Sequence, residues 1–367
     1  MKRLLSALLF LITCTLLAYF VVELTYVFFG VGILDILGMP GYVLMLAIFI
    51  LLGIFLSHLG SVLGGLLTGW KLAEFSLFGF GLHRDMENRL RLMYRPAPQP
   101  INSLMTPPRL DGSSPFGGIH AGHILLSAAV GAALMLLALL LRSVRIMPAV
   151  FVLGGFLIVL TVMNAFRVVS VVSHLKKNVY LRRANEFNAL TSAANRRGLG
   201  VSSLPDEAFV PFPEEALTAP QAFVAQCNIC TRLLNNGSYA LAHELLRQLA
   251  DVLPRKTFRL ANKPVWNQAL TLNGAIAEMM TGAEPRLSEK LSDEGMKVIN
   301  TPGWHERLLL ARYLRALLVT QDKTDATNRL AELSTQLEAL PEERIIGARR
   351  ILSDAQSLAA ERNSTHD

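Results

Sequence analysis

The chain has few charged residues, since Asp, Glu, Lys and Arg make up 17% of its 367 residues, where an average soluble domain has about a quarter. Hydrophobic residues reach 52%. Nearly all of the long uncharged runs lie before about residue 172. This shortage of charge excludes a purely soluble protein and predicts a membrane part followed by a soluble part.

Cysteine is also scarce, with three residues in the chain, which excludes a disulfide framework. Cys227 and Cys230 are spaced for one face of a helix, so we expect them to pack in a core rather than to form a redox or zinc site. The net charge is +7. Because the basic residues lie mainly beside hydrophobic segments, we expect contact with the lipid bilayer and no nucleic-acid partner.

Four uncharged runs predict about four transmembrane helices, because each approaches or exceeds the roughly 20 residues that span a bilayer core. They are residues 4–22, 41–69, 122–141 and 146–166. No small-residue cleavage site follows the first run, so we expect an uncleaved anchor. Basic residues collect before the first span, between the second and third, and after the last. This distribution predicts that the N and C termini are cytoplasmic.

The loop between the second and third spans, residues 70–121, is rich in proline and glycine. We expect an irregular or re-entrant segment here, with a short strand or hairpin at the membrane surface over 70–82. The expected fold class is therefore an all-α membrane protein with one short re-entrant or hairpin loop. Its membrane domain should cover 1–175, and a juxtamembrane linker should cover 176–217.

Residues 218–367 predict a soluble domain of helical hairpins. Amphipathic helices are expected over 219–235 and 239–253, joined by the turn 236–238, with further pairs around 265–299 and 304–340. The stretch NNGSYALAHELL resembles the turn and second helix of a tetratricopeptide-type repeat. Such helical arrays offer a surface for proteins or peptides, so we expect a partner of that class.

Residues 56–81, LSHLGSVLGGLLTGWKLAEFSLFGFG, resemble the first catalytic segment of the site-2-protease-like family of intramembrane zinc metallopeptidases. Residues 103–129 are similar to the Pro-Pro loop and the following helix of some bacterial members, and residues 175–209 to the start of their attached helical domain. The resemblance implies that family's membrane fold and a location in the bacterial plasma membrane.

The catalytic residues of that family are replaced here. The family places two zinc-binding histidines at i and i+4 with a glutamate base between them. Those positions hold Ser57, His58 and Ser61, and no Asp or Glu occurs from Gly112 to Asn185 to supply a later ligand. The resemblance therefore implies a degenerate member: a pseudoprotease without metal or other cofactor, acting as a scaffold or regulatory protein through its cytoplasmic helical domain.

The alternative is an active intramembrane zinc metallopeptidase with an unorthodox site. His58, His120, His123 and Asp111 could converge on zinc, because His120 and His123 share a helix face at i, i+3. In the other interpretation His58 hydrogen-bonds a neighbouring helix, the two later histidines are polar ends of the third span, and Asp111-Gly112 is a turn. The sequence does not decide whether the protein is an enzyme, although the replaced catalytic residues are evidence against it. It does not identify the partner or the oligomeric state.

Small residues recur at near-helical spacing in the second span: Gly53, Gly60, Gly64 and Gly65. Gly60 and Gly64 form a small-xxx-small pattern, which allows a neighbouring helix to approach closely. We expect this pattern to serve packing within the bundle rather than dimerisation.

Overall fold

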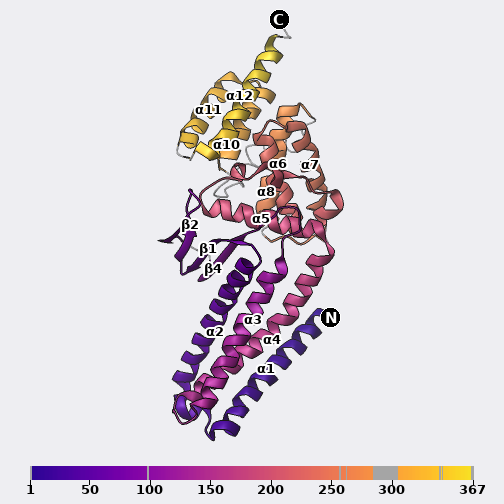
Figure 1. Ribbon diagram of the computed structural model, residues 1–367. Helices are drawn as coiled ribbons and strands as arrows, with labels where there is room; N and C mark the ends of the chain where they lie inside the picture. Colours follow the sequence, from indigo (N-terminus) through magenta and orange to yellow (C-terminus); the bar gives the residue numbers. More distant parts are fainter. Residues whose placement is uncertain are drawn as a thin grey trace. The chain divides into compact units, whose positions relative to one another are not determined.

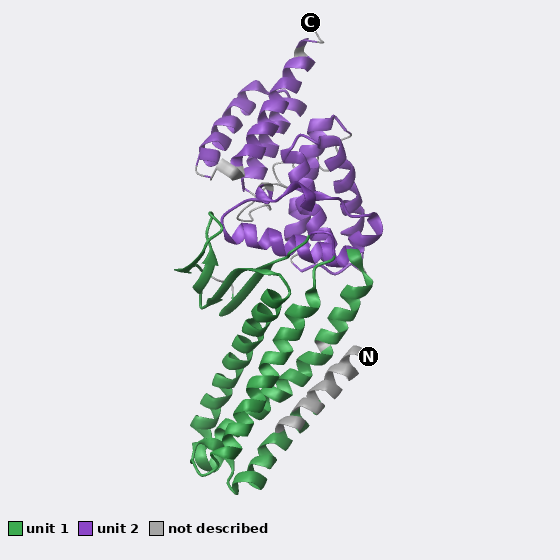
Figure 2. Cartoon of the chain, in the orientation of Figure 1, with its two compact units in different colours: residues 1–109, 113–179 green, residues 110–112, 180–367 purple. Residues whose placement is uncertain are grey.

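The computed structural model describes residues 2–96, 99–255, 258–261, 263–283, 305–338, 340 and 342–364. This part of the chain is mostly helical and belongs to two compact units (Figures 1 and 2). The first unit comprises residues 1–109 and 113–179, and the second comprises residues 110–112 and 180–367.

The first unit is built on long helices: α1 (Lys2–Phe29), α2 (Ile33–Leu67), α3 (Phe116–Leu140) and α4 (Met147–Lys177). Among the described residues, α2, α3 and α4 are long and apolar enough to cross a membrane, and α1 adds the shorter apolar stretch Tyr19–Phe29. This confirms the prediction of a mostly helical membrane protein.

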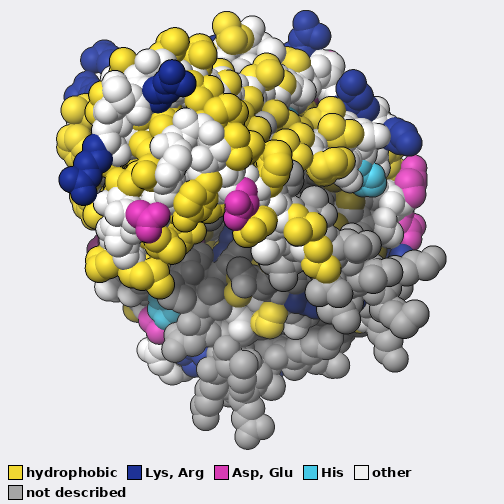
Figure 3. All heavy atoms as spheres, turned by 90° about the horizontal axis from the view of Figure 1, so that it is seen from below, with side chains coloured by type: hydrophobic (Ala, Val, Ile, Leu, Met, Phe, Trp, Pro, Cys, Tyr) yellow, Lys and Arg dark blue, Asp and Glu magenta, His cyan; other side chains and the backbone are white. Residues whose placement is uncertain are grey.

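The surface of these helices fits a lipid environment. Large side chains point outward, as Leu67 does at 88% exposure and Phe166 at 74%. Hydrophobic side chains also cover much of the face seen in Figure 3. Exposing this apolar area to water costs free energy, whereas exposing it to lipid tails does not. Inside the bundle, α4 packs against α1, α2 and α3, and Val21, Met45 and Phe156 form part of the buried contact.

Helix α2 begins eight residues before the expected run. The Asp35 carboxylate accepts a hydrogen bond from the Gly32 backbone N–H at 3.1 Å, which satisfies a donor at the helix start. Gly38, with a φ of 62°, then interrupts the helical backbone shortly before Pro40, which cannot donate a main-chain hydrogen bond. The helix ends before Gly69, whose φ is 88°.

A four-stranded antiparallel sheet corrects the expectation of an all-α fold and of an irregular middle loop. The strands are β1 (Lys71–Leu77), β2 (Phe80–Arg84), β3 (Leu90–Tyr94) and β4 (Ile101–Thr106), in the order β3-β2-β1-β4. The expected hairpin over 70–82 corresponds to β1 and β2. The described prolines of this region, such as Pro96, Pro100 and Pro107, lie outside the strands, so the ladders keep their backbone donors.

The second unit is helical in its described part. It contains α5 (Val179–Arg196), α6 (Pro220–Asn235), α7 (Tyr239–Val252), α8 (Lys263–Thr281), α10 (His305–Leu314), α11 (Lys323–Glu338) and α12 (Glu342–Ser364). Helices α6 and α7 occupy the two most clearly predicted positions. The expected helical segment over 284–299 lies outside the described residues. Helix α12 follows the last pair and was not expected.

The segment expected as a linker, 176–217, is largely built into this second unit. It contains α5 and three 3-10 turns, Val201–Ser203, Asp206–Phe209 and Glu214–Thr218. Phe187, Phe212 and Leu217 are buried in the core that also contains α6. The segment is therefore part of the hydrophobic core of the unit, because its apolar side chains recur on the inner side of short helical turns.

Helix α12 returns to the start of the domain. It packs against α6 and α10, while α6 also packs against α7 and α8. The Tyr239 hydroxyl donates a hydrogen bond to Asp354 of α12 at 2.6 Å. The Arg307 guanidinium donates to the Asn235 side chain at the end of α6. These contacts join residues more than 70 positions apart, which a stack of neighbouring pairs alone would not do.

Candidate functional site

The three motif positions lie in the second half of α2, and the side chains of His58 and Ser61 have hydrogen-bond partners within the protein. Nδ1 of His58 lies 2.6 Å from the Ser103 hydroxyl of β4. The Ser61 hydroxyl donates to the Ser57 carbonyl at 3.0 Å, one helical turn earlier. His58 therefore links α2 to the sheet, with a strand as its partner rather than the helix that we expected.

Glycines bring α2 and α3 into backbone contact beside this histidine. A Cβ on Gly60 would overlap the Gly122 carbonyl oxygen, and one on Gly122 would overlap the Gly60 carbonyl oxygen. The same relation holds between Gly64 and the Gly118 carbonyl oxygen. Gly60 and Gly64 thus serve packing inside the bundle, as predicted.

The other candidate ligands lie in different surroundings. His120 and His123 are both partly buried in the first turns of α3, and the His123 carbonyl accepts a hydrogen bond from Ser127 at 3.2 Å. Asp111 is exposed and belongs to the second unit. Within the described ranges, no group of three or more His, Cys, Asp or Glu side chains could hold a metal ion.

Asp111 precedes a glycine turn, as the second interpretation expected. Gly112 has a φ of 84°, a region that glycine occupies without strain. Its backbone N–H donates to a carboxylate oxygen of Glu186 at 2.7 Å. Because Glu186 of α5 is fully buried, this hydrogen bond fixes the turn inside the second unit.

A buried polar cluster on the sheet escaped the sequence analysis. Glu74 of β1 accepts hydrogen bonds from Ser76 at 3.1 Å and from the Asn102 amide of β4 at 2.8 Å. His83 of β2 is opposite Glu74 in the ladder, with Nδ1 3.7 Å from the carboxylate. Glu74, Ser76 and His83 are each at most 1% exposed. The alternation of Glu74 and Ser76 with apolar residues was the available signal.

The two cysteines of α6 are core residues. Cys227 is 4% exposed and Cys230 is 0% exposed, in the same core as Phe223 and Leu234. Burial raises the pKa of the Cys227 thiol well above its usual value and that of Cys230 to about 12. Both side chains are therefore neutral thiols at physiological pH and poor nucleophiles.

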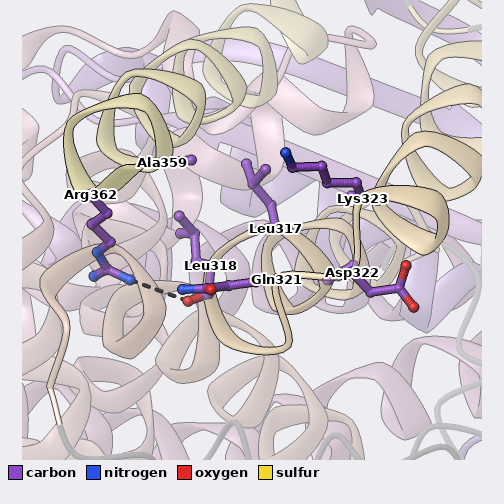
Figure 4. A pocket seen from close by; sticks show the side chains of 9 residues that line it. Leu317, Leu318, Gln321, Asp322, Lys323, Ala359 and Arg362 are labelled. Atoms are coloured by element: carbon purple, nitrogen blue, oxygen red, sulfur yellow. Dashed lines mark hydrogen bonds between the residues drawn. The ribbon is translucent and has the colours of Figure 1, made fainter. Parts of the chain in front are cut away.

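A small cavity lies where α11 and α12 meet the π-helical turn Arg315–Val319 (Figure 4). Its volume is about 60 Å³, and its walls combine Leu317 and Leu318 with polar side chains of Gln321, Lys323 and Arg362. The Arg362 guanidinium donates to the Leu318 carbonyl at 3.2 Å, which fixes one wall. Gln321, with a φ of 54°, turns the chain into α11.

Comparison with protein-family models, with curated proteins and with solved structures gives no match for this chain.

Proposed function

We propose that the protein is a catalytically silent, membrane-embedded relative of the site-2-protease-like metallopeptidases that serves as a scaffold or regulatory protein. The hydrogen bond between His58 and Ser103 carries this proposal. The side chain at the position of the family's glutamate holds a helix to a strand, and the flanking motif positions hold serines, of which Ser61 bonds back to its own helix. Serine is a poor zinc ligand, so we assign these three positions a structural role rather than metal binding.

The proposed topology has four spans, with α1 as the first. Lys2 and Arg3 begin α1, while Lys176 and Lys177 end α4. Basic residues near the ends of spans favour the cytoplasmic side. We therefore propose that the spans lie in a bacterial plasma membrane and that both termini and the second unit lie in the cytoplasm.

We further propose that the second unit is a tetratricopeptide-like domain that binds a protein or peptide. The antiparallel pairs α6/α7 and α10/α11 support this assignment. Its candidate contact is the cavity beside Gln321, where leucine side chains adjoin one acidic residue, Asp322, and two basic residues, Lys323 and Arg362. At about 60 Å³ the cavity has room only for the end of one side chain of a partner, and its two basic side chains suit a carboxylate there.

A photo-crosslinking amino acid at Gln321 of the full chain tests this contact in cells. We expect one adduct of discrete mass at Gln321 and none at Thr327, an exposed position farther along α11. The Lys323→Glu substitution should abolish the adduct, because it reverses the charge at the cavity wall. Equal labelling at both positions, or an adduct that survives Lys323→Glu, would contradict a specific partner at this cavity.

The alternative zinc metallopeptidase is favoured by one observation. Helices α2 and α3 touch through Gly60 and Gly122, which brings the backbone of His123 beside the turn that follows His58. Elemental analysis of the purified full chain, native and with His58→Ala, separates the two functions. The scaffold predicts no stoichiometric zinc in either form. One zinc per chain that is lost with His58→Ala would overturn the scaffold, and peptide cleavage abolished by the same substitution would then support the alternative.

A further inference from the structure

A groove between α3 and α4 is unfilled by side chains of the first unit. It encloses about 520 Å³, within the range of roughly 300–1,000 Å³ typical of ligand sites. Gly117, Ala121 and Ile124 of α3 line one wall. The α4 wall consists of Val168, Val169, Val172, Ser173, Lys176 and Lys177. Spacings of three and four residues place each set on one helix face.

The groove forms because α3 and α4 are in backbone contact at Gly131 and Gly154 but are separated at the start of α3. In the second half of α3 and the first third of α4, a Cβ on Gly131 would lie 2.8 Å from the Gly154 carbonyl oxygen, so the backbones are in contact there. At the start of α3, a Cβ on Gly117 would have no neighbour within 4 Å. Small residues on α3 thus leave room beside the valines of α4.

We propose that this groove binds an anionic phospholipid, with an acyl chain along the valines and the phosphate at Lys176 and Lys177. The groove lies at the start of one membrane-length helix and at the end of another, where a span meets the headgroup region. Both lysines are exposed in the last turn of α4. Neither α3 nor α4 contains an Asp or Glu. The two lysine ammonium groups at the mouth of the groove are opposite in charge to a lipid phosphate.

Lipid titration of the full chain in detergent, followed by native mass spectrometry, tests the proposal. The probes are phosphatidylglycerol and phosphatidylcholine with the same acyl chains. We expect one tightly bound phosphatidylglycerol and weaker binding of phosphatidylcholine. Replacing both lysines, as Lys176→Gln with Lys177→Gln, should raise the apparent Kd for phosphatidylglycerol by about tenfold or more.

Two further variants separate the groove from general charge. Gly117→Leu should weaken binding similarly without changing charge, because its side chain enters open space in the groove. Arg142→Gln with Arg145→Gln removes two charges from the turn at the opposite ends of α3 and α4 and should leave binding unchanged. Circular dichroism confirms that each variant is folded. Equal binding of the two lipids, or equal loss in the arginine variant, would overturn the proposal, as would unchanged binding in either groove variant.

Discussion

The hydrogen bond of His58 is the contact on which the proposed scaffold function depends most. From the sequence alone, His58 is a candidate zinc ligand, because the resemblance aligns it with the family's catalytic base. Its Nδ1 lies 2.6 Å from the Ser103 hydroxyl, 45 residues away, in a partly buried site. A polar group in such a place is stabilised when it is paired and costly when it is not.

Ser103→Ala should therefore destabilise the first unit by about 1–2 kcal/mol, because the imidazole loses its partner. Thermal unfolding of the full chain in detergent measures the effect. Ser170→Ala, at an exposed position of α4, is the matched control and should change the unfolding temperature little. Equal shifts for the two variants would show that the hydrogen bond contributes no stability.

The buried cysteines of α6 predict a dependence of stability on alkaline pH. The pKa of Cys230 is raised from 9.0 to about 12, and burial also raises that of Cys227. Well below pH 9 both thiols are neutral whether the chain is folded or unfolded. As pH rises from about 9 toward 12, only the unfolded chain ionises, so stability falls by up to about 1.4 kcal/mol per pH unit and thiol.

Denaturant unfolding between pH 8 and 11 tests this slope. The double substitution Cys227→Ala with Cys230→Ala should flatten it, since the ionising groups are gone. Ile229→Val, a fully buried position on the same helix, should lower stability at every pH without changing the slope. A slope that the double substitution leaves unchanged would exclude the thiols as its cause.

At the scale of elements, the contact between α2 and α3 depends on glycine. Gly64→Ala should destabilise the bundle by roughly 1–3 kcal/mol or prevent its packing, because the new Cβ overlaps the backbone at Gly118. Gly117→Ala, at an open position of α3, is the matched control and should be tolerated. Unfolding temperatures and expression in membranes give the comparison. A stable Gly64→Ala variant would mean that the helices can separate without cost.

The sheet is the element that sequence reasoning described least well. Its two faces differ: Phe75 contacts Phe55 of α2 with ring centroids 5.8 Å apart, while Glu74 and His83 form the buried polar cluster of the other face. The loop composition, rich in proline and glycine, favoured irregular structure. Short strands with alternating side chains formed nevertheless, because pairing with neighbours satisfies their backbone groups.

At the scale of the whole molecule, Leu110–Gly112 belongs to the second unit although the residues on both sides belong to the first. Leu110 packs on the core of the second unit, and Gly112 donates to the buried Glu186 carboxylate. The chain thus contributes to its helical unit well before α5 begins. This segment contains Asp111, one of the candidate ligands of the alternative zinc site.

Glu186→Leu should speed hydrogen exchange at the Gly112 amide by about tenfold to a hundredfold, since a buried donor loses a charged acceptor. Hydrogen exchange with mass spectrometry on a peptide that covers 110–112 provides the measurement. Asp111→Asn changes the exposed neighbour and should leave the exchange rate as it is. Identical rates in the wild type and Glu186→Leu would show that the Glu186 contact does not protect the turn.

The sequence by itself determined the features that depend on local composition and periodicity. Uncharged runs located α2, α3 and α4, because lipid accepts only apolar segments with internally satisfied backbones. Amphipathic spacing and the turn at Gly237 located α6 and α7. The i, i+3 spacing placed Cys227 and Cys230 on one core face.

Only the tertiary structure decided the contacts between distant residues. Strand β3 pairs with β2, and β4 pairs with β1. Helix α12 contacts the start of α7 through the hydrogen bond between Tyr239 and Asp354. His58 hydrogen-bonds Ser103, which lies 45 residues away in the sequence. The groove above Gly117 likewise depends on how two helices diverge. Such features follow from shape and mutual burial, which local sequence patterns do not encode, because each partner could have packed elsewhere with the same local structure.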